Sequence, residues 1–209
     1  MKKTFILILF LLLAAAASPA QTKNKYSYLK QKQFIPVELG KVYLGMPFAD
    51  FARQIDLKNA EVDNRFEWLE ATLPFAKGNI ESINFKVYGL TEEDNAKFIY
   101  KTTTGKKTER NEDYEVEVQM IDPAKIPAKG IVYEISLRYK KAFDLKAQAI
   151  KMFGVSKDVY KAGDQFHIYD MQWTKKTTDG LTWLIRYYEE TNALMLAGVI
   201  PKTEWDPGV

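Results

Sequence analysis

The chain has no cysteine and a single histidine in 209 residues. Without cysteine there is no disulfide, no thiol nucleophile and no cysteine metal ligand. A bacterial lipoprotein anchor is excluded as well, because it requires a cysteine at the cleavage point. One histidine without any cysteine leaves too few ligands for the usual transition-metal sites. We therefore expect neither a metal nor a cofactor.

The chain also has little net charge. The formal value is +3, and Lys2 and Lys3 contribute to it. A nearly neutral chain gives no electrostatic argument for binding nucleic acid. Hydrophobic residues make up 46% of the sequence and aromatic residues 13%, which predicts a packed core and not widespread disorder.

Long apolar runs are confined to one place, residues 5–17, directly after Lys2 and Lys3. The run is too short for a transmembrane helix and ends in small residues, which is typical of a signal peptide. We expect residues 1–20 to be removed by cleavage between Ala20 and Gln21. The product is then expected in the bacterial periplasm or the medium, without stable membrane insertion. Residues 21–33 are polar and are predicted to form an N-terminal tail.

Hydrophobic periodicity predicts three helices and an antiparallel sheet. Residues 46–55 place Phe48, Phe51 and Ile55 on one helical stripe. Thr91 is the expected cap of a helix that runs to about residue 101, and a third helix is predicted at 142–153, before Gly154. Alternation and turn residues predict strands at 37–44, 66–75, 80–88, 114–120, 131–139, 166–175, 181–188 and 194–200. Residues 102–113 are polar and are predicted to be a loop.

The order of these elements repeats once. A strand, a helix and an aromatic strand pair follow one another in residues 34–130, with an inserted helix and loop, and again in residues 131–200. We therefore predict an α+β fold with helices packed on antiparallel sheet, in two related helix-plus-meander modules, and a C-terminal tail at 201–209. The repeat is one of order and not of residue identity.

The segment Leu44-Gly45-Met46-Pro47-Phe48 opens a short helix that leads into an antiparallel meander. Over residues 37–200 this arrangement resembles tandem exported helix-plus-meander modules, as in the small lipoprotein of the barrel-assembly machinery and in the β-lactamase inhibitor protein. The chain departs from both, because it has neither the lipidation cysteine nor the disulfides, and residues 91–113 are an insertion. The resemblance implies a sheet face that binds protein and carries over no site residue.

His167 is the one candidate for chemistry near neutral pH. Period two places it on a strand face with Tyr169 and Trp173, and we predict that this face contributes to recognition. Each residue also has a structural alternative. His167 can be a partly buried sheet histidine with a hydrogen-bond partner, and Trp173 can be a core residue, which we favour slightly over a role in recognition. No Gly-x-Ser-x-Gly motif accompanies His167 to supply a nucleophile.

Three further patterns have unremarkable explanations that we prefer. Residues 102–108 are similar to a phosphate-binding loop, but Tyr100 and Lys107 break the motif. Carboxylates that alternate with apolar residues predict a solvated sheet face more simply than a glycosidase pair; they are Glu67, Glu70, Glu115, Glu117 and Glu134. Lysines around the third helix are either a solvated helix face, which we favour, or a surface for an acidic partner or anionic polymer; they are Lys140, Lys141, Lys146, Lys151, Lys157 and Lys161.

Since no catalytic constellation is found, we expect a non-enzymatic interaction module. It is predicted to bind another envelope or secreted protein through a sheet face. The alternative is a periplasmic protein that binds a small ligand or glycan in an aromatic pocket. A flat aromatic face with a polar rim would favour the first function, and a deep pocket with convergent polar groups the second.

Overall fold

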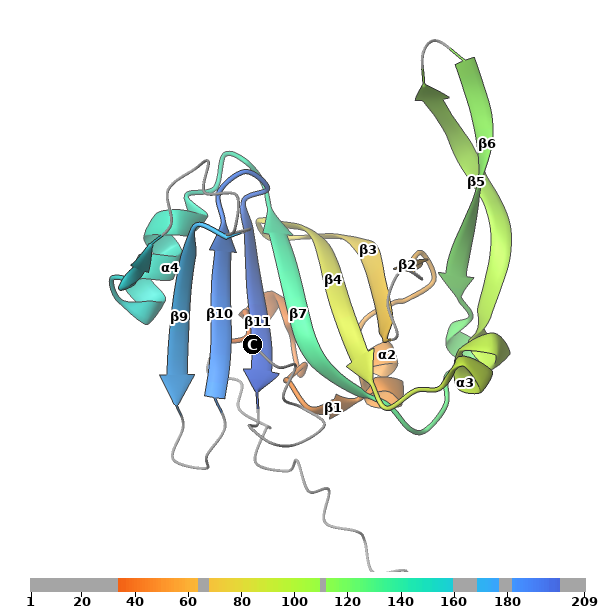
Figure 1. The fold of residues 1–209 in the computed structure, drawn as a ribbon, viewed down its shortest axis with the longest axis horizontal. Helices are drawn as coiled ribbons and strands as arrows, with labels where there is room; N and C mark the ends of the chain where they lie inside the picture. Colours follow the sequence, from red (N-terminus) through yellow and green to blue (C-terminus); the bar gives the residue numbers. More distant parts are fainter. Residues whose placement is uncertain (1–33, 64–67, 110–111, 160–168, 177–181, 200–209) are drawn as a thin grey trace, which may run out of the picture.

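The computed structural model describes residues 34–63, 68–109, 112–159, 169–176 and 182–199. These residues form one antiparallel sheet of eleven strands with helices beside it (Figure 1). The α+β class with an antiparallel sheet is thus confirmed. The strands are β1 (Met46–Pro47), β2 (Glu61–Asp63), β3 (Leu69–Lys77), β4 (Ile80–Tyr88), β5 (Ile99–Glu109), β6 (Glu112–Ile121), β7 (Ile131–Tyr139), β8 (Asp158–Val159), β9 (Met171–Lys176), β10 (Thr182–Tyr188) and β11 (Ala193–Val199).

The sheet is continuous across the predicted module boundary at residue 130. The strand order is β5-β6-β2-β3-β4-β7-β11-β10-β9-β8, and β1 pairs separately with β7. β7 pairs with β4 on one side and with β11 on the other. The segments 34–130 and 131–200 therefore share one sheet, with β7 at its centre.

One face of the sheet, here called the core face, carries the main hydrophobic core. Helix α2 (Phe48–Gln54) packs on it, with the Phe51 and Phe85 ring centroids 4.8 Å apart. Helix α4 (Leu145–Phe153) covers the other end, where Phe153 lies 5.4 Å from Trp173. Both helices match predicted amphipathic segments, because their apolar stripes meet the inward residues of the strands.

Helix α4 has a capping residue at each end, Asp144 before it and Gly154 after it. The carboxylate of Asp144 accepts a hydrogen bond from the Ala147 backbone N–H at 3.0 Å, so Asp144 is the N-cap. Gly154 ends the helix with φ 84, a backbone conformation that side chains other than glycine rarely adopt. The helix predicted at 142–153 is therefore confirmed with a later start.

Helix α3 (Glu92–Phe98) has the predicted cap at Thr91, in a capping box with Asp94. It ends earlier than predicted, because β5 begins at Ile99. The polar loop predicted at 102–113 is wrong: β5 and β6 pair there as a long hairpin that projects from the body of the sheet (Figure 1). Because residues 102–108 lie within a strand of this hairpin, they are no phosphate-binding loop before a helix.

The strand predicted at 37–44 is also wrong. Residues Val37–Leu39 form a 3-10 helix, η2, and the chain then turns at Gly40 with φ 65. Leu39, Val42 and Leu44 are nevertheless buried in the main core. The apolar residues of this segment are buried although the segment is irregular. Hydrophobic periodicity alone does not distinguish such a segment from a strand.

Two short elements complete the fold, the 3-10 helix η3 (Pro123–Lys125) and the β1–β7 bridge at Met46. None of the helices in the described part of the chain has the length and hydropathy needed to cross a bilayer.

Candidate functional site

The sheet face opposite α2 and α4, here called the second face, carries rows of polar and aromatic side chains. The strand registers align Glu70, Lys86 and Glu134 across β3, β4 and β7. The same row continues into Ala197 and Leu184 on β11 and β10. Charge therefore gathers over the first strands of the row and apolar side chains over the last.

Lys86 lies between the two carboxylates. Its Nζ is 2.9 Å from Glu134 Oε1 and 4.0 Å from Glu70 Oε2. The carboxylate side chains are only 15% (Glu70) and 12% (Glu134) exposed. The solvated face predicted for these acids is thus not what the structure has at Glu70 and Glu134. We call Glu70, Lys86 and Glu134 the charged triad.

The triad holds more negative than positive charge in a desolvated place. Burial raises the pKa of Glu134 above its usual range, and the nearby Lys86 ammonium opposes this shift. Asn84 donates a hydrogen bond to Glu70 Oε1 at 2.9 Å, whereas the buried Glu70 Oε2 accepts none. The triad therefore has unused acceptor capacity for a donor or cation.

Three aromatic side chains lie beside the triad on the second face. Trp68 and Tyr88 are 36% and 41% exposed, which is high for large aromatic residues. The Tyr133 ring is edge-on to the Tyr88 ring, with the two centroids 6.4 Å apart. The pKa of Tyr133 is raised, mainly by burial and further by the nearby charges of Glu134 and Glu70. Lys86 Nζ lies 5.6 Å from the Trp68 ring centroid and so links these aromatic residues to the triad. We call Trp68, Tyr88 and Tyr133 the aromatic trio.

The far side of the second face is more apolar. Leu184, Met195 and Ala197 form a small buried cluster that is separate from the main core, and Tyr188 packs against it. Next to it, Arg186 Nε donates to Gln172 Oε1 at 2.8 Å and the guanidinium lies 4.5 Å from the Tyr169 ring centroid.

The structure separates the residues predicted for recognition. Trp173 is 4% exposed on the core face, and its Nε1 donates to the Gly154 carbonyl oxygen at 2.8 Å. Tyr169 lies instead against Arg186, which bonds to Gln172. Gln172 and Trp173 are consecutive residues of β9, so their side chains lie on opposite faces of the sheet. Tyr169 and Trp173 therefore do not share a face, and the buried position of Trp173 matches the alternative that it is a core residue. His167 lies outside the described residues.

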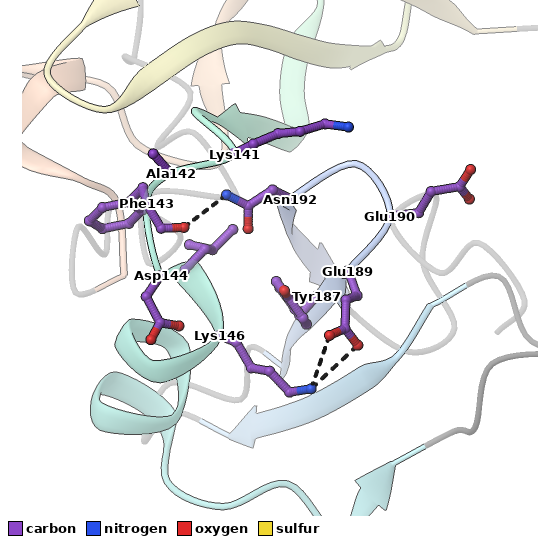
Figure 2. A pocket seen from close by; sticks show the side chains of 10 residues that line it. Lys141, Ala142, Phe143, Asp144, Lys146, Tyr187, Glu189, Glu190 and Asn192 are labelled. Atoms are coloured by element: carbon purple, nitrogen blue, oxygen red, sulfur yellow. Dashed lines mark hydrogen bonds and ion pairs between the residues drawn. The ribbon is translucent and has the colours of Figure 1, made fainter.

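A pocket opens where α4 starts and β10 ends (Figure 2). Its volume is about 470 Å³, and side chains of both charges line it. Lys146 Nζ lies 3.3 Å from Glu189 Oε2, and the Asn192 amide donates to the Lys140 and Phe143 carbonyl oxygens at 2.8 and 3.0 Å. Asp144 caps α4, as described above. Lys146 and Glu189 thus pair with each other, and the Asn192 and Asp144 side chains bond to backbone groups.

No group of three or more metal-ligating side chains is found in the described ranges. Sequence reasoning missed the charged triad and the aromatic trio as a site. The signal was present as polar residues at alternate positions of three strands. It became informative only once the registers showed that these residues lie side by side.

The geometry thus defines a sheet face on which exposed aromatic rings flank a buried, incompletely neutralised carboxylate pair. Comparison of the chain with protein-family models, with curated proteins and with solved structures finds no match.

Proposed function

We propose that this protein is a non-enzymatic interaction module that binds another protein through the second face of its sheet. The observation that carries the proposal is the exposed pair Trp68 and Tyr88 beside the charged triad. Aromatic side chains with polar neighbours supply much of the binding energy in many protein interfaces. An exported location is part of this proposal and rests on the apolar run at 5–17.

The arrangement of the helices supports the choice of face. The buried residues of α2 and α4 all belong to the core-face cluster, so both helices are committed to one side of the sheet. On the other side, the trio and triad come from the adjacent strands β3, β4 and β7 and from Trp68, directly before β3. Side chains on rigid strands lose little conformational entropy when a partner binds.

A pocket for a small ligand is the second candidate, and the structure supports it less. The pocket of Figure 2 is polar, and Lys146 and Glu189 already pair across it. Ligand pockets usually combine a mainly apolar lining with a few unsatisfied polar groups. The two related modules stay part of the proposal, since each half of the chain places a helix between strands of the shared sheet.

Site-specific photo-crosslinking in the source cells tests the proposed function. A photoreactive side chain replaces Tyr88, and a matched variant carries it at Tyr100, an exposed tyrosine on β5. We expect a defined protein adduct from position 88 and a weaker or different one from position 100.

The companion variant Trp68→Ala should reduce the adduct at position 88, and a urea titration checks that this variant, at a side chain 36% exposed, still folds. Equal adducts from positions 88 and 100, or a position-88 adduct that persists in full without Trp68, would contradict the proposal. A ligand that shifts NMR signals of Tyr187 and Asn192 and of no second-face residue would favour the pocket instead.

A further inference from the structure

The corner of the molecule where α4 ends and β8 begins exposes an unusual group of apolar side chains. Val155 is 81% exposed, Val159 55% and Met152 42%. Exposed apolar residues that are scattered singly need no explanation, but these three lie between residues 152 and 159. We call Lys151, Met152, Val155, Lys157 and Val159 the α4–β8 corner.

The chain at this corner is held so that the valines stay outside. Ser156, between them, is buried, and its hydroxyl lies 2.6 Å from the Gln172 carbonyl oxygen. The same hydroxyl accepts a hydrogen bond from the Asp158 backbone N–H at 3.1 Å. Upstream, the Gly154 carbonyl oxygen accepts the Trp173 indole N–H. With its polar groups anchored inward, the segment presents Val155 outward in a fixed conformation.

The charges around the corner are mainly positive. Lys151 and Lys157 are exposed, and Lys175 donates from Nζ to the Phe153 carbonyl oxygen at 2.6 Å. Asp158 is the one acid in the segment 151–159. Exposed apolar side chains beside lysine ammonium groups are complementary to the surface of a lipid bilayer, in which phosphate groups lie above the apolar acyl chains.

We propose that the α4–β8 corner binds the surface of an anionic lipid bilayer. Val155, Val159 and Met152 enter the boundary between headgroups and acyl chains, and Lys151 and Lys157 pair with lipid phosphates. The contact is shallow and reversible, which agrees with the absence of a membrane-spanning helix among the described residues.

The observations favour a bilayer over a protein at this corner. The exposed apolar side chains at the corner are three within the segment 152–159, and two exposed lysines lie among them. A stable protein interface requires a broad complementary area, whereas a bilayer adapts to isolated protruding side chains. The corner is also separate from the second face, so this inference goes beyond the proposed function.

Vesicle co-sedimentation tests the inference. One vesicle preparation is phosphatidylcholine alone, and the other mixes phosphatidylcholine with phosphatidylglycerol. All protein samples carry the same processed N-terminus, checked by mass spectrometry, because residues 5–17 would themselves partition into a bilayer. We expect binding to the anionic vesicles that weakens as salt rises, and little binding to phosphatidylcholine.

Matched variants then locate the contact. The double variant Val155→Asp/Val159→Asp should lower the partition coefficient at least about tenfold, since it removes two inserted apolar groups and adds like charge. Lys151→Glu and Lys157→Glu should each lower it about fivefold or more. The controls are Val37→Asp, at a valine 88% exposed on η2, and Lys58→Glu, at an exposed lysine outside the corner; both should bind as the unaltered protein does.

All corner positions to be changed are exposed, so the thermal unfolding midpoints should match that of the unaltered protein. Absence of binding to the anionic vesicles at low salt would overturn the inference. So would equal losses at Val37 and Val155, or corner variants that abolish a protein crosslink while vesicle binding stays unchanged.

Discussion

Replacement of Lys86 by methionine is the most direct test of the charged triad. The variant keeps most of the aliphatic side chain and removes the ammonium group that lies between Glu70 and Glu134. At an effective dielectric constant near 20, an ion pair at 4 Å is worth about 4 kcal/mol before desolvation is counted. The two pairs here lie at 4.0 and 2.9 Å.

The net loss of stability is smaller than the sum of the two attractions. In the unaltered protein, desolvation of the Lys86 ammonium group already offsets part of the attraction, and the variant no longer carries this cost. Removal of one partner from a buried pair costs about 3 to 5 kcal/mol. These side chains keep 12–21% exposure, so we expect about 2 to 3 kcal/mol near neutral pH.

The dependence of this loss on pH distinguishes charge from packing. The pKa of Glu134 is already raised by burial and should rise further without Lys86. A carboxyl group whose pKa is higher in the folded state destabilises the fold as pH rises through that pKa. The difference between the variant and the unaltered protein should therefore shrink as pH is lowered toward 4.5, the ordinary value for glutamate.

Urea unfolding followed by tryptophan fluorescence, at neutral pH and near pH 4.5, measures both effects. The triple variant Lys86→Met/Glu70→Gln/Glu134→Gln is the control, because it removes the uncompensated charges and should recover most of the stability. A loss for Lys86→Met that is the same at both pH values would refute the electrostatic argument, as would a triple variant no more stable than the single one.

Three further predictions concern other parts of the chain. Trp173→Ala should lower the free energy of unfolding by about 3 to 5 kcal/mol in urea titration, because Trp173 is buried against Phe153; a change below about 1 kcal/mol would show that this side chain is not part of the core. The pKa of Asp94 is lowered by the Lys129 ammonium and then by the Thr91 backbone N–H, so Asp94 stabilises the fold above pH 3.8 and this contribution is lost as pH falls below it. In the variant Asp94→Asn, the urea midpoint should therefore fall less steeply as pH is lowered below 3.8. An equally steep fall in the variant would contradict this role of Asp94. Mass spectrometry of the exported protein should find an N-terminus at Gln21, and mature material that retains Met1 would overturn the predicted processing.

Elements with one buried face were predictable from sequence. The bounds predicted for β4 and β7 are those of the structure, because clean alternation of apolar and polar residues marks a half-buried strand. Helix α2 was found for the same reason at a period of 3.6 residues. Strand β5 was missed because Thr102 to Thr108 gives no alternating apolar signal, although its threonines have high β-propensity.

The candidate site depended on information that one sequence does not hold. Glu70, Lys86 and Glu134 are far apart in the chain and look like ordinary solvent-facing residues of their strands. Their charges interact only because β3, β4 and β7 pair in the observed registers. A shift of one residue in either register would move a carboxylate to the opposite face.

The position of β11 has a consequence for when the protein can fold. This last strand lies between β7 and β10, and β8, β9 and β10 connect to the rest of the sheet through it. A chain still emerging from the ribosome lacks this connection until residues 193–199 are available. Contacts between β11 and β7 also span more than fifty residues, and such non-local pairing forms slowly because a long loop must close first. The sheet should therefore be completed only once β11 is available, and until then β8, β9 and β10 have no strand that joins them to β7.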